Sequence, residues 1–228
     1  TEWISVHYGD RAVGVLLPYL RASTKAISKA LYTLGSKHND HSAFAKPAVS
    51  PERSAVDRLQ YLFVQVGCRC HPKEWDENGP TGGTHRFEYS PGELEAVLSE
   101  KNDARASVAE MLRLLKDNRK AFESSTYKTL IEDAEALSQY VEANSLYMEA
   151  FWRLKIWNRS EIGSSARNEQ VERVLKVARE AHEIQLMPQD FPGKKGPKSF
   201  TALIDEVVGI MIGDHGGYNM PNLHPPYR

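Results

Sequence analysis

The chain has 228 residues, 41% of them hydrophobic, which is enough to bury a substantial core. Its 29 lysine and arginine residues nearly balance 30 aspartate and glutamate residues, so no net field favours nucleic acid or an anionic membrane as a partner. No run approaches the roughly 18 apolar residues that a membrane-spanning helix needs. We therefore expect a soluble protein with neither nucleic acid nor a membrane as its partner.

The first predicted helix runs from Asp10 to about Gly35. Its apolar residues recur at spacings of three, four and seven, which is typical of one buried helical face. Gly35 is expected to cap the end of the helix, and Pro18 to lie within its first two turns or to kink it. The expected buried face consists of Val13, Leu16, Leu17, Leu20, Ile27, Leu31 and Leu34.

A polar loop is expected over residues 36–50, followed by an apolar segment, Val56–Val66, that fits a helix or a short strand and that we interpret as a helix. Residues 67–89 have no helical period and are rich in proline, glycine and aromatic residues, which predicts a loop too long to be a mere connection. The only cysteines, Cys68 and Cys70, are separated by one residue, a spacing that disfavours both a structural disulfide and a zinc site. We expect no metal or other cofactor, and cysteine usage indicates no compartment.

The segment Ser90-Pro91-Gly92-Glu93 predicts a helix start, because the serine can cap the helix while the glutamate bonds back to the chain before it. This helix should run to about Phe122, and a second long helix from Ser124 to about Trp157. So short a connection makes the two helices antiparallel neighbours. The expected buried faces are Leu94, Val97, Leu98, Val108, Met111, Leu112 and Leu115 on the first, and Tyr127, Leu130, Ile131, Ala134, Leu137, Val141, Met148 and Phe151 on the second.

Two further helices are predicted over residues 166–186 and 199–212, with residues 212–228 as an extended tail. Their apolar faces are Val171, Val174, Leu175, Ala178 and Ala181, and then Phe200, Leu203, Ile204, Val207, Val208 and Met211. The predicted fold is an all-α helical bundle of about five or six helices, with two long antiparallel central helices and long loops. We expect residues 1–228 to form a single helical domain.

Helical bundles can house a pair of metal ions, but the helices here lack the Glu-x-x-His pairs that such a site uses. Glu180 and His182 are only two residues apart and point about 200° from each other around a helix. Phe151, Trp152 and Trp157 could form a stacking platform for a ligand, yet their helical spacing favours a place in the core. No catalytic residue and no metal ligand is assigned.

The candidate substrate-binding residues lie in the loop from His71 to Tyr89. Carboxylates beside an indole ring are typical of saccharide sites, where the apolar face of a pyranose stacks on the ring and its hydroxyls bond the acids. The same mixture also describes an ordinary structured surface loop, and both interpretations stay open. The candidates are Glu74, Trp75, Asp76, His85 and Tyr89.

The first residues, Glu2-Trp3-Ile4-Ser5-Val6-His7-Tyr8-Gly9, followed by a helix with Leu16, Leu20 and Ser23, resemble the point where α-glucuronidase-type glycoside hydrolases leave their catalytic barrel. The resemblance implies a C-terminal helical domain that supports oligomerisation or borders the cleft. It also implies that the catalytic carboxylates belong to a barrel that this sequence lacks. The chain would then be a fragment of a longer protein, with the parent's catalytic domain, a saccharide and a second copy as its expected partners.

The expected function is therefore a non-catalytic helical accessory domain of a larger carbohydrate-active protein. One alternative is a stand-alone helical protein-interaction module. Another is a hydrolase that uses Glu74, Asp76 and His85 as acid and base, because loop carboxylates next to an indole can have raised pKa values.

Overall fold

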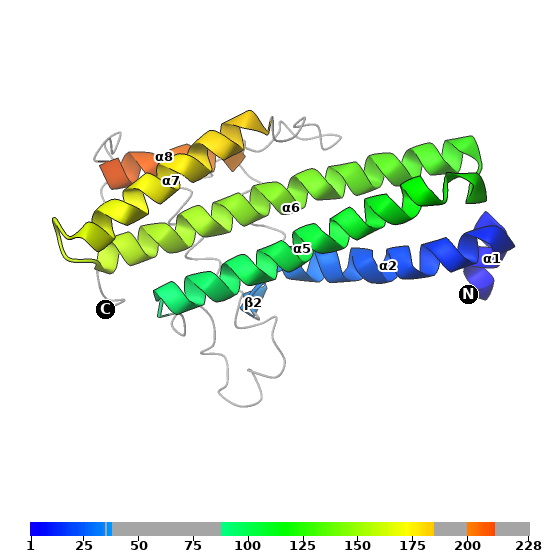
Figure 1. Ribbon diagram of the computed structural model, residues 1–228, viewed down its shortest axis with the longest axis horizontal. Coiled ribbons are helices and arrows are strands. Elements are labelled where there is room, and N and C mark those ends of the chain that lie inside the picture. The colour runs from blue at the N-terminus through cyan, green and yellow to red at the C-terminus, as the bar shows by residue number, and fades with distance from the viewer. Residues whose placement is uncertain (35, 38–87, 185–199, 213–228) are drawn as a thin grey trace, which may run out of the picture. The chain divides into compact units, whose positions relative to one another are not determined.

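The computed structural model describes residues 1–34, 36–37, 88–184 and 200–212 (Figure 1). Within these residues the regular elements are six α-helices, one short 3-10 helix and one pair of two-residue strands, so the all-α fold class is confirmed. The chain divides into two compact units. Unit 1 comprises Thr1–Ala30 with Ser99–Glu142, and unit 2 comprises Leu31–Leu98 with Ala143–Arg228.

Unit 1 begins with a short helix, α1 (Glu2–Tyr8), and continues with α2 (Asp10–Leu31). Gly9 separates them with φ 83, a left-handed conformation that favours glycine, and its N–H donates to the Ser5 carbonyl at 2.9 Å. The predicted helix start at Asp10 is confirmed, and Pro18 lies inside the helix. The helix ends before Gly35, which lies outside the described residues. After α2, strand β1 (Tyr32–Thr33) pairs antiparallel with β2 (Ser36–Lys37) in unit 2.

The buried face of α2 differs from the predicted one. Leu16 is buried as expected, but Leu20 and Ile27 are 45% and 42% exposed, so the prediction was wrong for them. Small residues occupy much of the face that packs into the core, and small side chains let neighbouring helices approach closely. The buried residues of α2 are Ala12, Val15, Leu16, Tyr19, Ala26 and Ala30.

The predicted start of the next helix, α5 (Pro91–Asp117), is confirmed in a modified form. The Ser90 hydroxyl accepts from the N–H of Glu93 at 3.2 Å, as a capping serine should. The Glu93 carboxylate, however, reaches past Ser90 and accepts from the N–H groups of Glu88 at 3.0 Å and Tyr89 at 2.6 Å. These bonds help to hold Tyr89 at φ 48, a left-handed conformation that costs a residue with a side chain roughly 1–2 kcal/mol.

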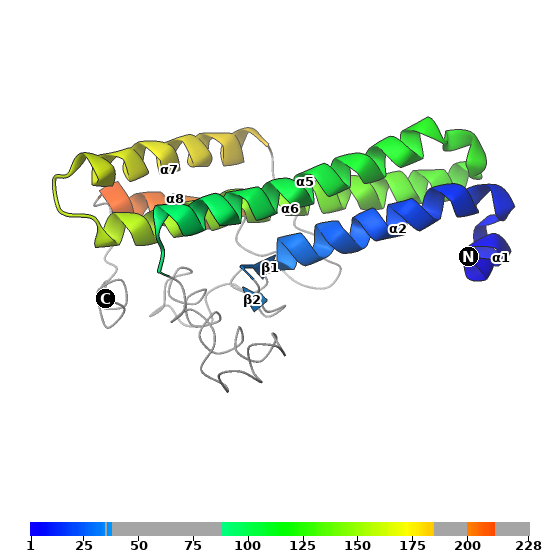
Figure 2. The same ribbon diagram turned by 60° about the horizontal axis from the view of Figure 1, so that its bottom comes forward.

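The two long helices run antiparallel, as predicted (Figure 1). α5 ends at Asp117, five residues before the expected end, and a 3-10 turn, η3 (Arg119–Ala121), leads to α6 (Ser124–Arg159). In unit 1 both views show α2 beside α5 (Figures 1 and 2). The buried core of this unit consists of Ile4, Ala12, Leu16, Tyr19, Ala26, Ala30, Ala104, Val108, Met111, Leu115, Ala134 and Val141.

One lysine of α5, Lys101, is buried in unit 1 next to the last turn of α2. Lys101 on α5 is only 1% exposed, and its Nζ donates to the Lys29 carbonyl at 2.8 Å and to Glu100 Oε1 at 3.0 Å. The first bond satisfies one of the carbonyls that a helix leaves unpaired at its C-terminus. Burial lowers the pKa of Lys101, and the neighbouring Glu100 carboxylate only partly offsets that effect.

Lys101 should make the stability of the protein rise with pH in alkaline solution. Between its lowered folded pKa and its unfolded value of 10.5, the unfolded chain binds more protons than the folded chain, so the free energy of unfolding increases. Below the folded pKa the lysine is charged in both states and adds no pH dependence. Lys101→Met should abolish the increase, which urea unfolding between about pH 7 and about pH 10 would detect.

Lys116→Met, at an exposed position on the same helix, is the matched control. Burial also raises the pKa of Tyr19 and Tyr140, which lowers stability above about pH 10 and sets the upper limit of the useful range. If the free energy of unfolding had the same pH dependence in wild type and in Lys101→Met, the burial of the Lys101 ammonium group would be contradicted.

In unit 2 the C-terminal half of α6 is buried on all sides. From Ala143 to Trp157, every residue except Glu149 is buried. A helix segment that is buried around its whole circumference belongs to a core, so the choice of Phe151, Trp152 and Trp157 as core residues is confirmed. Arg167 lies over the Trp157 ring at 3.8 Å and donates to the carbonyls of Trp157 and Ser160, both at 3.1 Å, which caps the end of α6.

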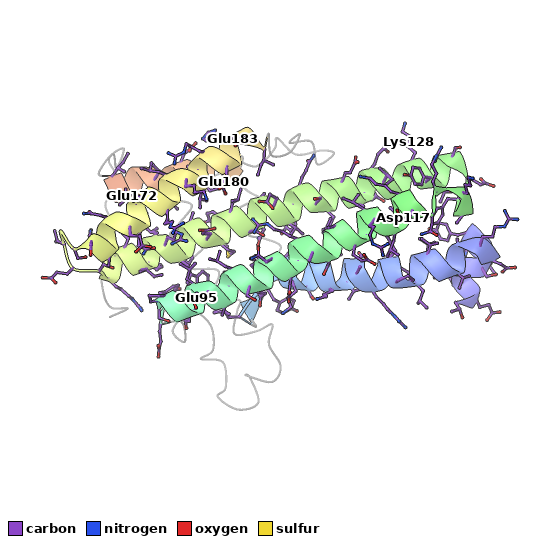
Figure 3. All side chains as sticks on the ribbon, in the orientation of Figure 1. Glu95, Asp117, Lys128, Glu172, Glu180 and Glu183 are labelled. Carbon is purple, nitrogen blue, oxygen red and sulfur yellow. The ribbon has the colours of Figure 1, made fainter. Side chains whose placement is uncertain are left out.

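Unit 2 also contains α7 (Ser165–Glu183) and α8 (Phe200–Ile212), which pack against each other. The Ser164 hydroxyl caps α7 by accepting from the N–H of Arg167 at 3.2 Å. Several charged side chains of α7, among them Glu172 and Glu183, are exposed to solvent (Figure 3). The inward faces of α7 and α8 comprise Gln170, Val174, Val177, Ala178 and Ala181, and Ile204, Val207, Ile210 and Met211.

The predicted faces of these two helices are therefore partly confirmed. On α7, Val174, Ala178 and Ala181 are buried as expected, whereas Val171 and Leu175 are only half-buried. Ile212, expected to begin the tail, is the last residue of α8. The predicted helix Val56–Val66 and the tail beyond Ile212 lie outside the described residues. None of the described helices combines the length and apolarity needed to cross a bilayer.

Candidate ligand pocket

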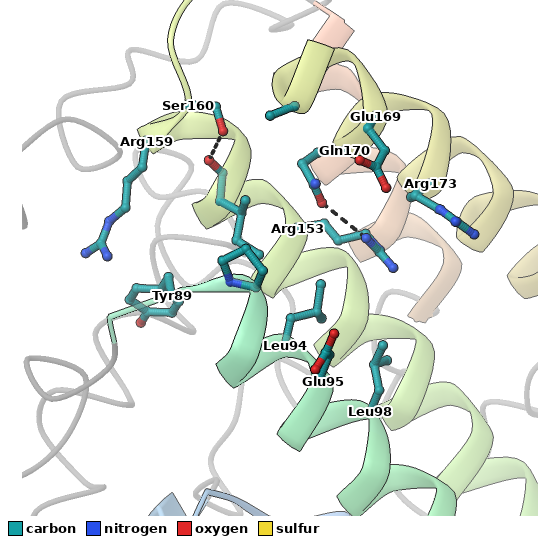
Figure 4. Close-up of a pocket in the computed structure, with 13 residues that line it drawn as sticks. Tyr89, Leu94, Glu95, Leu98, Arg153, Arg159, Ser160, Glu169, Gln170 and Arg173 are labelled. Atoms are coloured by element: carbon teal, nitrogen blue, oxygen red, sulfur yellow. Dashed lines mark hydrogen bonds between the residues drawn. The ribbon is translucent and has the colours of Figure 1, made fainter. Parts of the chain in front are cut away.

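A pocket opens on unit 2 where the first turns of α5, the last turns of α6 and the first half of α7 meet (Figure 4). Its volume is about 580 Å³, within the range of sites that take small organic ligands. Part of its lining is apolar, and the rest consists of charged and polar side chains. The apolar residues are Pro91, Leu94, Leu98, Ile156 and Ala166, and the polar ones are Glu95, Arg153, Arg159, Ser160, Glu169, Gln170 and Arg173, with Tyr89 between the two groups.

Arg153 is the most deeply placed charge in the pocket, at 8% exposure. Its guanidinium is fixed by Glu149 Oε1, which lies 2.8 Å from Nε and 2.7 Å from Nη2, and by Gln170 Oε1, which accepts from Nη1 at 3.1 Å (Figure 4). An arginine carries five N–H donors, and these bonds use three of them. Its other two N–H groups have no acceptor among the described residues, and Glu149 on α6 and Gln170 on α7 hold the side chain in place.

Three exposed charges surround this arginine. Glu95 lies on α5, and Glu169 and Arg173 lie one turn apart on α7 (Figure 4). None of the three forms an ion pair or a side-chain hydrogen bond with the described part of the chain. The pocket therefore offers carboxylate acceptors and guanidinium donors together, next to apolar surface.

Tyr89 is the one predicted substrate-binding residue that the structure describes, and it lines the pocket. Its ring is buried, with centroids 5.3 Å from Trp152 and 6.1 Å from Phe151. Arg159 lies over the same ring at 5.2 Å and donates to the Glu88 carbonyl. The Tyr89 ring therefore forms part of the pocket wall, and it is not exposed as a surface on which a ligand could stack. Glu74, Trp75, Asp76 and His85 lie outside the described residues, as do Cys68 and Cys70.

Sequence reasoning missed most of the polar lining of this pocket. Glu95, Glu169 and Arg173 occupy ordinary solvent-facing positions on their helices, so nothing in the periodicity distinguishes them. Arg153 did leave a signal. It interrupts the apolar run from Leu146 to Trp157, and Glu149 precedes it by four residues, the spacing at which two side chains meet on a helix.

Within the described ranges, no group of three or more histidine, cysteine, aspartate or glutamate side chains could hold a metal ion. Comparison with known proteins gave no match to any family model, any curated protein or any solved structure.

Proposed function

We propose that the chain is a non-catalytic helical accessory domain of a carbohydrate-active protein, and that the pocket on unit 2 is its saccharide-binding site. The observation that carries the proposal is the combination of apolar lining with uncommitted donors and acceptors in one small pocket. A pyranose has the matching character, since its C–H faces are apolar and each of its hydroxyls both donates and accepts.

The charges of the pocket favour a neutral, hydroxyl-rich ligand over a simple anion. Arg153 is already neutralised by Glu149, and the Glu169 carboxylate adds a negative charge to the lining one turn from Arg173, although the two form no ion pair. A site for phosphate or sulfate would normally present positive groups without such compensation. Carboxylates such as Glu95 would repel an anion, but they are good acceptors for hydroxyl groups.

The accessory role is supported by the resemblance of the segment Glu2–Gly9 to the start of the helical domain in α-glucuronidase-type enzymes. Tyr89 supports the same proposal, because it is the last residue of the predicted saccharide-binding loop and it lines the pocket.

Binding to a glycan array, followed by calorimetry with the best oligosaccharide, tests the proposal. Glu169→Gln removes one charged acceptor and should weaken binding at least about tenfold, which corresponds to roughly 1.4 kcal/mol. Glu172→Gln makes the same change at an exposed position of α7 outside the pocket lining, and should leave the affinity unchanged. Absence of binding to every glycan, or equal effects of the two substitutions, would rule out the pocket as a saccharide site.

Two further measurements distinguish the alternatives. Loss of glycan binding in Trp75→Ala would favour the accessory domain over a stand-alone interaction module, whereas turnover that Glu74→Gln abolishes would favour a hydrolase. One observation does favour an interaction role, namely the pair of exposed apolar residues on α2, Leu20 and Ile27.

A further inference from the structure

A line of apolar side chains runs along the outer side of α2, where the described part of the chain leaves it partly uncovered. Leu20 and Ile27 are 45% and 42% exposed, and Val13 and Leu17 are only half-buried. At about 100° per residue these four side chains fall on one side of the helix, next to the face that enters the core of unit 1. We call these four residues the α2 ridge. It covers about 21 Å of helix, or about four turns.

Positive charge lies beside the ridge. α2 contains four lysine and arginine residues but a single carboxylate, Asp10, which accepts a hydrogen bond from the Ser5 hydroxyl. Arg11, Arg21 and Lys25 are exposed, and none of them forms an ion pair or a hydrogen bond through its side chain with the described part of the chain.

Two arginines elsewhere in unit 1 are paired with carboxylates. Arg113 pairs with Glu110 at 2.7 Å and with Asp117 at 2.9 Å, and Arg105 pairs with Glu142 at 2.5 Å. These two arginines are therefore neutralised, whereas the exposed Lys116 and Lys120 form no ion pair with the described part of the chain. Arg21 and Lys25 remain uncompensated on the side of α2 next to the apolar ridge, whereas Arg11 lies on the opposite side of the helix.

We propose that the α2 ridge binds an acidic amphipathic helix of a partner protein. Such a helix would lay its apolar face on Leu20 and Ile27 and place carboxylates against Arg21 and Lys25, as helices do when they dock in grooves. The cations follow the ridge on one side only, since its other side adjoins the core. The partner should therefore carry its carboxylates along one edge of its apolar face.

The same charges argue against the other occupants of such a surface. A second copy packed ridge to ridge would bring Arg21 and Lys25 close to their own counterparts, and like charges across an interface are costly. An anionic bilayer would meet a helix most favourably with cations on both sides of its apolar face, whereas here they lie on one.

Two synthetic helices of about three heptads provide the probe. Both carry leucine at the two core positions of each heptad, one with glutamate and the other with lysine at the flanking positions. Fluorescence anisotropy should show the glutamate peptide binding the full chain at least about tenfold more tightly than the lysine peptide, with an affinity that falls as salt is added.

The variants separate apolar docking from charge pairing. Arg21→Glu combined with Lys25→Glu leaves the ridge intact and should reverse the preference, so that the lysine peptide binds more tightly. Leu20→Glu should abolish binding of the glutamate peptide, whereas Ile162→Glu, at an 87% exposed isoleucine on the α6–α7 turn, should not change it. Circular dichroism checks that each variant keeps its helix content.

Three results would overturn the inference. They are equal binding of the two peptides, sedimentation showing a dimer that Leu20→Glu dissociates, and binding to phosphatidylserine vesicles without binding to either peptide. None of these results bears on the pocket of unit 2, so this inference and the proposed saccharide site stand or fall separately.

Discussion

Trp152→Ala is expected to lower the free energy of unfolding by about 3–5 kcal/mol, the range seen when a large aromatic side chain is removed from a core. Trp152 is fully buried in the half of α6 that has almost no exposed side chain. Its ring centroid lies 5.8 Å from that of Phe151 and 5.3 Å from that of Tyr89. An alanine would leave a cavity that these rigid neighbours cannot fill, and urea unfolding would measure the loss.

Trp3→Ala is the matched control, because Trp3 on α1 is 58% exposed. Its ring lies against that of His7, tilted by 45° with a centroid distance of 4.7 Å, but the larger part of the Trp3 surface is already exposed to water. Its removal should cost less than about 1 kcal/mol. If the two alanine variants lost similar amounts of stability, the all-round burial of the C-terminal half of α6 would be wrong.

Arg153→Met is expected to lower the free energy of unfolding by about 3 kcal/mol. The substitution leaves Glu149, whose side chain is 19% exposed, without its cation, and it leaves Gln170 Oε1 without its donor. Removing one partner from a buried charged pair is costly because the remaining charge cannot regain its hydration. The methylene groups of methionine keep most of the packing of the arginine stem, so the loss reports on the charge.

A double-mutant cycle with Glu149→Leu isolates the interaction. The double variant Arg153→Met with Glu149→Leu should lose less free energy of unfolding than the two single variants lose together, and the difference should be about 1 kcal/mol or more. The exposed pair Lys128–Glu132, at 3.8 Å, provides the comparison, and its coupling should stay below about 0.5 kcal/mol. Additive effects at Arg153 and Glu149 would mean that the arginine is not held by the carboxylate.

Local signals accounted for the parts of the fold that were predicted well. The start of α5 is determined within four residues by Ser90 and Glu93, and the long helices by apolar periodicity over many turns. The face of α2 was wrong because large apolar residues were taken to mark the core, whereas Ala12, Ala26 and Ala30 pack there. When a helix has two apolar faces, the shape of the neighbouring helices determines which face is buried. The sequence of the helix itself does not contain that information.

The polar sites were harder to predict because their partners are distant in sequence. Lys101 is paired with a carbonyl 72 residues away, and Arg153 with Gln170, 17 residues away on another helix. Both residues looked like interruptions in an apolar pattern, and only their partners explain how the charge is tolerated. Tyr89, in contrast, was chosen as a candidate contact from its loop and does line the pocket.

Nuclear magnetic resonance of the 15N-labelled chain, titrated with the best-binding oligosaccharide, tests the saccharide site most directly. The side-chain amide of Gln170 and the Nε–H of Arg153 lie in the pocket and give signals of their own. We predict that these two signals and the backbone amides of Glu169 and Arg173 shift together along one binding curve. Shifts confined to other parts of the chain, with these four signals unmoved at saturation, would contradict the proposed site.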